Sequence, residues 1–270
     1  MLRFTEQELE LVPLVEGALE ITAAVAPGFP AGWVKIQLEK MAQEAEHALL
    51  DEPNAYLRLE GLIRLFYREW GFAGDHEQYY SSENIYLDKV LERKRGIPVS
   101  LGALFLYVAD RLELPVAGIC FPTQFVIKVD WPEREAQYIN PFDGEFVSKR
   151  TMGAWLKGHR GPFSELRSEY FTLASNSDVL ARWLTVMKSS FLREGLFAEA
   201  LRCSDVVLDT FRPGDPHEIR DRGFIYQQLE CDHAAAMDFE YFIEQCPQDP
   251  AAELLKLQVE ELSKVPLTLH

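Results

Sequence analysis

The sequence predicts an α+β domain, helix-rich with a small antiparallel sheet, followed by an all-α repeat domain. Its 270 residues are 47% hydrophobic, which is enough for a substantial core. Two observations predict this class. Residues 84–125 place a loop, an apolar helix and a β-rich run in succession, and from about residue 176 the chain repeats itself at a fixed interval. We therefore divide the chain into residues 1–170 and 171–270.

Apolar residues at helical spacing predict helices through the first 80 residues. The first uses positions from Leu9 to Ala23 and ends at the Pro- and Gly-rich stretch 27–32. The next two cover residues 33–50 and 54–70, and a polar, glycine-containing loop follows over residues 71–84. In the second helix we expect the inward side chains to be Ile36, Leu38, Met41, Ala45 and Leu49.

A short helix over residues 85–94 precedes a nearly all-apolar helix over residues 100–112. A helix that is apolar on every side is buried on every side. Pro98 suits a first helical position, because its missing N–H has no helical partner there.

Three β-rich runs follow the apolar helix, over residues 116–121, 125–130 and 137–141. They predict short antiparallel strands packed against that helix, which makes the first domain α+β. A further helix is predicted over residues 151–160.

The last third of the chain has an internal repeat. Pro213 recurs as Pro247 and Ala200 as Ala234, both at an offset of 34 residues. A period of this length with helix, turn, helix and closing proline is that of tetratricopeptide repeats. The predicted helices cover residues 177–194, 197–211, 217–229, 232–245 and 251–263. Because so few repeats are unstable alone, we expect them to dock on the first domain.

The composition argues against several classes of function. A net charge of −16 repels phosphate backbones and disfavours nucleic-acid binding. The N-terminus is acidic, and no window reaches the roughly 18 apolar residues of a membrane span, so we expect a cytoplasmic protein without membrane contact. No Gly-rich phosphate loop is present, and we expect no cofactor. Cys231 and His233 are two residues apart but lack further ligands, so we expect no metal.

Short motifs surround the apolar helix. They are Val-Leu-Glu-Arg-Lys-Arg-Gly at 90–96, Ile-Pro-Val-Ser-Leu at 97–101, Leu-Pro-Val-Ala-Gly at 114–118, Phe-Pro-Thr-Gln-Phe at 121–125 and Ile-Asn-Pro-Phe-Asp-Gly at 139–144. With these motifs, residues 80–145 resemble the SirB-type branch of the bacterial transglutaminase-like superfamily, whose members often carry a tetratricopeptide tail. The resemblance implies a papain-like core.

Catalytic members of that superfamily use a cysteine at the start of the buried helix, a histidine on a strand and an aspartate on the next strand. By the resemblance, these positions fall on Pro98, Gln124 and Asn140. Proline has no nucleophile, glutamine is no base near neutral pH, and asparagine carries no charge. The two amides can still keep a hydrogen bond between adjacent strands. The resemblance therefore implies an inactive thiol site whose three positions share one cleft.

Three functions remain open, although the sequence offers nothing positive for one of them, a small-ligand sensor that uses the old cleft. The other two differ in whether the protein is a catalyst. The preferred one is a non-catalytic protein-interaction module in which the repeats hold a protein or peptide partner. The alternative is a hydrolase or acyl transferase with a rearranged site around Ser100, for which His76 is the candidate base. Structural roles are also open: Ser100 as a helix cap and His76 as a solvated loop residue. A basic cluster at residues 93–95 is either a solvated face or an anchor for an acidic partner.

Overall fold

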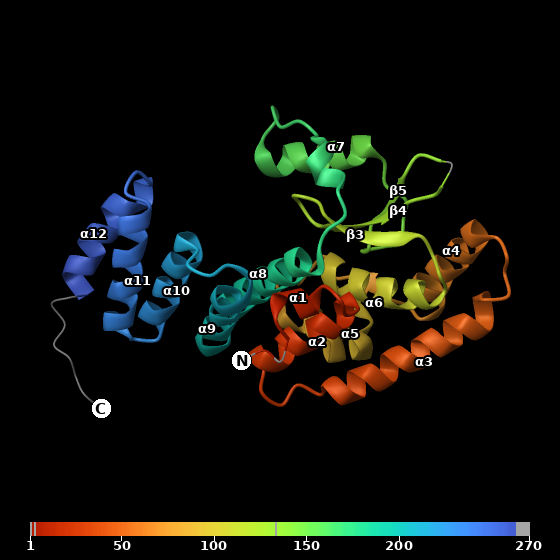
Figure 1. Cartoon of the computed structure of the whole chain (residues 1–270), viewed down its shortest axis with the longest axis horizontal. Coiled ribbons are helices and arrows are strands. Elements are labelled where there is room, and N and C mark those ends of the chain that lie inside the picture. Colours follow the sequence, from red (N-terminus) through yellow and green to blue (C-terminus); the bar gives the residue numbers. More distant parts are fainter. Residues whose placement is uncertain (1, 3, 133, 263–270) are drawn as a thin grey trace.

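The computed structural model describes residues 2, 4–132 and 134–262, and shows an elongated molecule of helices around a small sheet (Figure 1). The N-terminal helices are α1 (Glu6–Leu9), α2 (Leu14–Val25), α3 (Ala31–Leu49) and α4 (Ala55–Arg64), which the π-helical turn η1 (Leu65–Glu69) extends. Within the described residues, no helix combines the length and the apolar character that crossing a membrane requires.

Two expectations for this helical part are wrong. The run from Leu9 to Ala23 forms two helices instead of one, because Pro13 cannot continue a helix and disfavours helical backbone in the residue before it. Ile36 is 56% exposed, whereas Val34 is buried. The buried stripe of α3 starts at Val34 and recurs every three or four residues, and Ile36 falls on the opposite face.

The sheet separates two layers of helix. Helices α5 (Leu87–Arg93) and α6 (Pro98–Arg111) precede strands β3 (Val116–Cys120), β4 (Phe125–Val129) and β5 (Gln137–Ile139), and α7 (Lys149–Arg160) follows them. The strands are antiparallel in the order β3-β4-β5, with Gly118 opposite Ile127 and Ile127 opposite Ile139. Figure 1 shows α6 on one face of the sheet and α7 on the other. The predicted strands are confirmed.

The alternation of side chains along the strands explains this sandwich. Successive residues of a strand point to opposite faces. Phe125 and Ile127 of β4 join the large core around α6, whereas Val126 joins a smaller cluster with Met152 and Leu156 of α7.

A short parallel pair of strands ties the start of α6 to the turn after β5. Strand β1 (Ala73–Gly74) pairs with β2 (Arg95–Gly96), and the Gly74 N–H donates to the Phe142 carbonyl at 2.7 Å. A Cβ on Gly74 would lie 1.2 Å from the Phe142 ring, so only glycine allows this approach. Strand β1 thereby holds the turn beside the residues that lead into α6.

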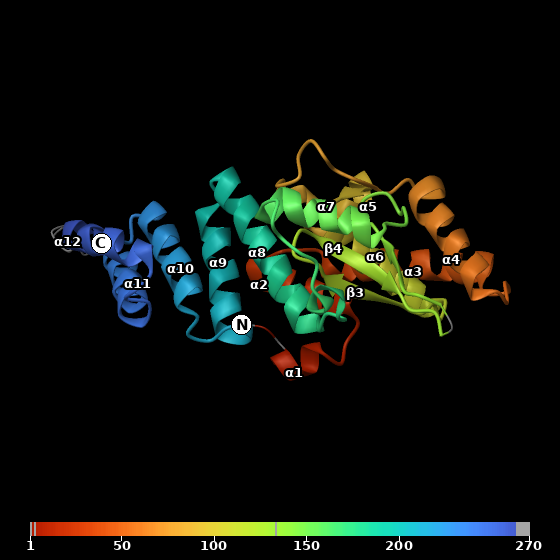
Figure 2. The ribbon, with the colours of Figure 1, turned by 90° about the horizontal axis from the view of Figure 1, so that it is seen from above.

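The C-terminal helices confirm the predicted repeats. They are α8 (Asn176–Glu194), α9 (Phe197–Val206), its π-helical extension η4 (Val207–Phe211), α10 (Pro216–Gln228), α11 (Asp232–Gln245) and α12 (Pro250–Leu262). The first of them dock on the body as expected: Trp183 and Phe191 of α8 share a core with Leu19 of α2 and Leu104 of α6. Helices α10 to α12 extend away from the body (Figure 2).

Candidate functional site

Two of the three inferred triad positions contact each other directly. The Gln124 side-chain N–H donates to the Asn140 side-chain oxygen at 3.1 Å, which confirms the expected amide–amide hydrogen bond. The same Asn140 oxygen accepts from the Phe142 N–H at 3.2 Å, and the Asn140 amide donates to the Asp143 carboxylate at 3.1 Å. Asn140 therefore organises the turn after β5 with no charge of its own, and Gln124 anchors that turn to the start of β4.

The third position, Pro98, is the first residue of α6 and is buried. Gly102, one turn later on α6, packs so closely on the sheet that an added Cβ would lie 2.5 Å from Phe125 and 3.5 Å from Pro141. These are the chain neighbours of Gln124 and Asn140. Residues four apart lie on one face of a helix, so Pro98 is on the side of α6 that faces the amide pair. That all three line a single cleft stays a prediction.

Ser100 is fully buried, and its hydroxyl is engaged by the main chain. It donates to the Asn84 carbonyl at 2.6 Å and accepts from the Ile97 N–H at 3.1 Å. The second bond satisfies an N–H at the start of α6 that has no helical partner, as a capping residue does. A nucleophile needs a free hydroxyl beside a base, and this one serves as a cap.

His76 belongs to the loop after β1 and packs against the turn after β5. Its ring stacks on Phe142 with 4.4 Å between ring centroids and 14° between ring planes, and the residue is exposed. Within the described part of the chain it forms no hydrogen bond with Ser100. The structure brings His76 to the Asn140 turn, and the Ser100 hydroxyl forms its hydrogen bonds with main-chain groups.

A polar network under the start of α6 involves residues of the preceding loop. Buried Asn84 donates to the Asp75 carboxylate at 3.2 Å, and Arg93 contacts the same carboxylate at 3.3 Å. Burial opposes ionisation of Asp75, but hydrogen bonds from Gln78, Asn84 and Arg93 hold the pKa of Asp75 below its ordinary value. Since the Asn84 carbonyl accepts from Ser100, this network fixes the loop that supports the helix start.

The basic residues 93–95 form contacts within the protein. Arg93 joins the Asp75 network, the Lys94 ammonium lies 4.3 Å from the centre of the Phe72 ring, and Arg95 donates to the Gly71 carbonyl at 3.2 Å. Burial lowers the pKa of Lys94. These contacts stabilise the β1–β2 region, with Arg93 and Lys94 partly buried and Arg95 exposed.

A cleft of about 730 Å³ opens beside the amide pair, between the β3–β4 turn, the end of α7 and helix α8. Thr123, the neighbour of Gln124, lines it together with Cys120 and Arg182. Burial raises the pKa of the Cys120 thiol, although the Arg182 guanidinium opposes the effect, so the thiol stays protonated at neutral pH. Among the described residues, no group of three or more His, Cys, Asp or Glu side chains could hold a metal ion.

Sequence reasoning missed the charge of α7. This helix carries Lys149, Arg150, Lys157 and Arg160 and has no acidic residue. The signal was present, since basic residues without acidic neighbours stand out in a chain of net charge −16.

Comparisons with known proteins agree with this architecture. The family model of the transglutaminase-like superfamily matches residues 32–185, and a tetratricopeptide repeat model matches residues 187–260. The chain is 49% identical to the UPF0162 protein of Vibrio cholerae over the full length of both. It is 40% identical to Protein SirB1 of Salmonella typhimurium and to the UPF0162 protein YchA of Escherichia coli K12, over 97% of each chain. No solved structure matches. The chain therefore belongs to the SirB1/UPF0162 family, transglutaminase-like proteins that end in tetratricopeptide repeats.

Proposed function

We propose that this protein is not a catalyst and acts as a protein-interaction scaffold, in which the repeats hold a segment of a partner protein. The inert side chains at Pro98, Gln124 and Asn140 support the first half of this proposal. An amide cannot take up a proton from a nucleophile near neutral pH, and the Asn140 oxygen accepts from Gln124 and from the Phe142 N–H instead of from an imidazole. Burial of the Ser100 hydroxyl at the start of α6 argues in the same direction.

The observation that carries the interaction role is an exposed apolar face on α10 and α12, which we call the repeat face. Leu254 and Leu257 of α12 are 71% and 63% exposed, and they border a shallow pocket together with Gln227 of α10. Phe224, one turn before Gln227, is 42% exposed. Large apolar side chains grouped on a helical repeat are typical of surfaces that bind another protein.

The repeat face also has defined geometry. The Gln258 amide donates to the Gln227 side-chain oxygen at 2.6 Å and so couples α12 to α10. Behind it, Phe239 and Phe242 of α11 and Leu255 of α12 form a buried cluster that supports both helices. A rigid apolar face of this kind fits the apolar side of an amphipathic helix or an extended apolar segment.

Affinity capture with the full-length protein tests the interaction role. We compare wild type with Leu254→Glu/Leu257→Glu, whose positions are exposed, so the fold should persist. The matched control is Leu11→Glu/Leu57→Glu, which changes two exposed leucines outside the repeats, 85% and 48% exposed. Quantitative mass spectrometry should recover specific partners with wild type and the control, and lose them with the repeat variant. Equal recovery with all three proteins would refute the assignment to the repeat face.

An active-site probe tests the absence of catalysis. A fluorophosphonate probe should leave the folded protein unlabelled, because the Ser100 hydroxyl is buried and bonded to main-chain groups. Ser100→Ala serves as the control for labelling elsewhere. Labelling of wild type that disappears in Ser100→Ala would instead support a hydrolase or acyl transferase.

A further inference from the structure

The exposed side of α7 and the loop after it differ in charge from the rest of the molecule. Residues 149–170 contain five basic and two acidic residues, a local charge of +3, in a chain whose total is −16. The remaining residues therefore carry −19. We use the name α7 surface for the four cations of α7 together with the loop residues Phe163 and Leu166.

Within the described residues, no cation of α7 contacts a carboxylate, whereas Arg167 of the following loop contacts Glu169 at 3.3 Å. Lys149 lies 5.3 Å from the centre of the Phe171 ring, and Arg160 donates to the Tyr170 hydroxyl at 3.2 Å. Arg150 and Lys157 contact no carboxylate within the part of the chain that the structure describes.

Several cations outside α7 contact carboxylates. Arg111 contacts Glu39 and Glu46 at 2.9 Å each, and Arg222 contacts Asp238 at 2.8 Å. The α7 surface thus keeps positive charge that the fold does not neutralise.

The position of these charges on α7 adds a second argument. Lys157 and Arg160 occupy the last turn, where the helix dipole favours cations. Lys149 and Arg150 occupy the first turn, where the dipole favours anions and no acidic residue is present. Cations at a helix N-terminus lower helix stability, so the stability of α7 does not account for them.

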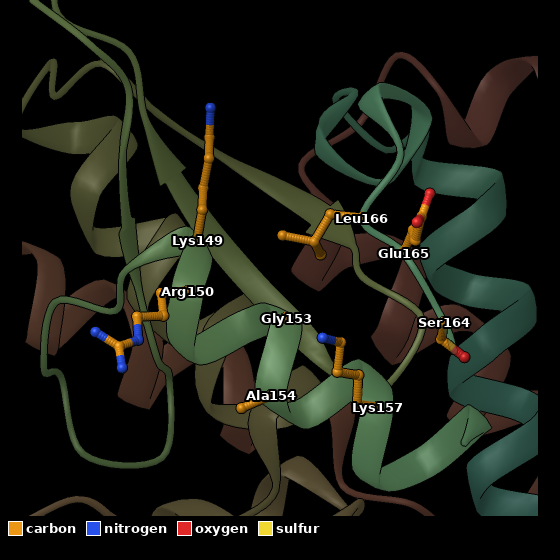
Figure 3. A pocket seen from close by; sticks show the side chains of 8 residues that line it. All are labelled: Lys149, Arg150, Gly153, Ala154, Lys157, Ser164, Glu165 and Leu166. Carbon is orange, nitrogen blue, oxygen red and sulfur yellow. The ribbon is translucent and has the colours of Figure 1, made fainter. Parts of the chain in front are cut away.

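The shape of the α7 surface combines these charges with an apolar floor. A groove of about 540 Å³ runs between α7 and the loop, and its lining includes three cations, Lys149, Arg150 and Lys157, one carboxylate, Glu165, and the apolar side chains of Ala154 and Leu166. Figure 3 shows the basic residues spread along α7, with Leu166 projecting toward the helix from the loop. The Leu166 side chain would lie 3.4 Å from a Cβ on Gly153, so the loop approaches α7 closely at this position. Beside the groove, Phe163 is 96% exposed.

We propose that the α7 surface binds a short acidic segment of a partner protein, in which carboxylates flank an apolar side chain. Carboxylates would pair with Lys149, Arg150 and Lys157, and the apolar side chain would contact Leu166 and Phe163. A short segment fits the field of the molecule, because charges further than the Debye length of about 10 Å are screened. A long duplex or a flat bilayer would also meet the acidic surface around the α7 surface and be repelled.

Fluorescence anisotropy with the full-length protein tests this proposal. The probe is a fluorescein-labelled peptide in which three glutamates precede and three follow a Leu-Phe pair. The variant Arg150→Glu/Lys157→Glu should weaken binding at least about tenfold, since two attractions become repulsions. Raising the salt concentration should weaken binding of the wild type.

The matched control is Lys40→Glu/Arg68→Glu, which makes the same change in net charge at exposed positions on α3 and η1. It should leave peptide affinity within about twofold of wild type, because a screened charge at a distance contributes little. Equal weakening by both variants would overturn the proposal, because total charge alone would then govern binding. Equal binding of a peptide with glutamine in place of glutamate would also overturn it.

The same variants separate the other classes of ligand. A 20-base-pair DNA duplex and vesicles containing phosphatidylserine should bind more weakly than the peptide. If either binds more tightly and Arg150→Glu/Lys157→Glu abolishes that binding, the surface serves that ligand and the proposal is wrong. The α7 surface and the repeat face share no residue, so the two proposals succeed or fail separately.

Discussion

A buried ion pair between α8 and α10 offers the sharpest test of how the repeats are held on the body. The Lys188 ammonium contacts the Glu218 carboxylate at 2.5 Å, and their side chains are only 7% and 9% exposed. In Glu218→Ala the ammonium stays buried, with the Asp221 carboxylate 3.9 Å away as its nearest remaining partner. Removing one member of such a pair destabilises by about 3–5 kcal/mol, because an uncompensated charge remains in the interior.

We expect Glu218→Ala to lower Tm by roughly 6–10 °C, at about 2 °C per kcal/mol for a chain of this size. Urea unfolding, followed by circular dichroism and by tryptophan fluorescence, measures the loss in free energy of unfolding. Trp183 reports on this region because it is buried in α8, the helix that carries Lys188. The control is Lys188→Met/Glu218→Met, which removes both charges and keeps the volume. We expect it to lie within about 1 kcal/mol of wild type. A double variant no more stable than the single one would refute this account of the α8–α10 contact.

Three further changes probe the site. Asp75→Asn should lower the free energy of unfolding at pH 7. Because the pKa of folded Asp75 lies below the ordinary 3.8, the wild type should lose the stabilisation by its carboxylate as pH falls through that range, whereas the variant has none to lose. The acid unfolding curves of the two proteins should therefore converge at low pH. Ser100→Ala should destabilise by about 1–3 kcal/mol in urea, since it leaves two buried main-chain groups unpaired. Gly102→Val should destabilise by about 1–3 kcal/mol through its clash with Phe125, whereas Gly158→Ala, with open space around it, should stabilise by about 0.5–1 kcal/mol.

The repeats were the most predictable part of the chain. Helix α11 spans Asp232–Gln245, as the period and its prolines indicated. Local signals suffice for α10 to α12, because repeats of this kind mainly contact their neighbours and end at a proline. By contrast, the parallel pair of Ala73–Gly74 with Arg95–Gly96 has no local signature, because strands of two residues acquire their partners only through the fold.

In the candidate site, too, some features could be predicted from the sequence and others required the tertiary structure. The identities of Pro98, Gln124 and Asn140 could be assigned from motifs, and so could the bond between the two amides. The burial of Ser100 could not be predicted from the sequence. Whether its hydroxyl acts as a cap or as a nucleophile depends on its hydrogen bond to the Asn84 carbonyl, which belongs to a different segment. The stacking of His76 on Phe142 likewise depends on the approach of Gly74 to the turn.

What the sequence by itself determined was the kind of molecule: helices and strands set by apolar periodicity and by proline, and a repeat set by its period. What only the tertiary structure decided was which groups are satisfied. It pairs Arg93 with Asp75 within the body and, among the residues described, leaves Arg150 and Lys157 of α7 without a carboxylate partner. The physical reason is that charge and burial depend on distances between segments far apart in the chain, which residue identity and spacing do not specify.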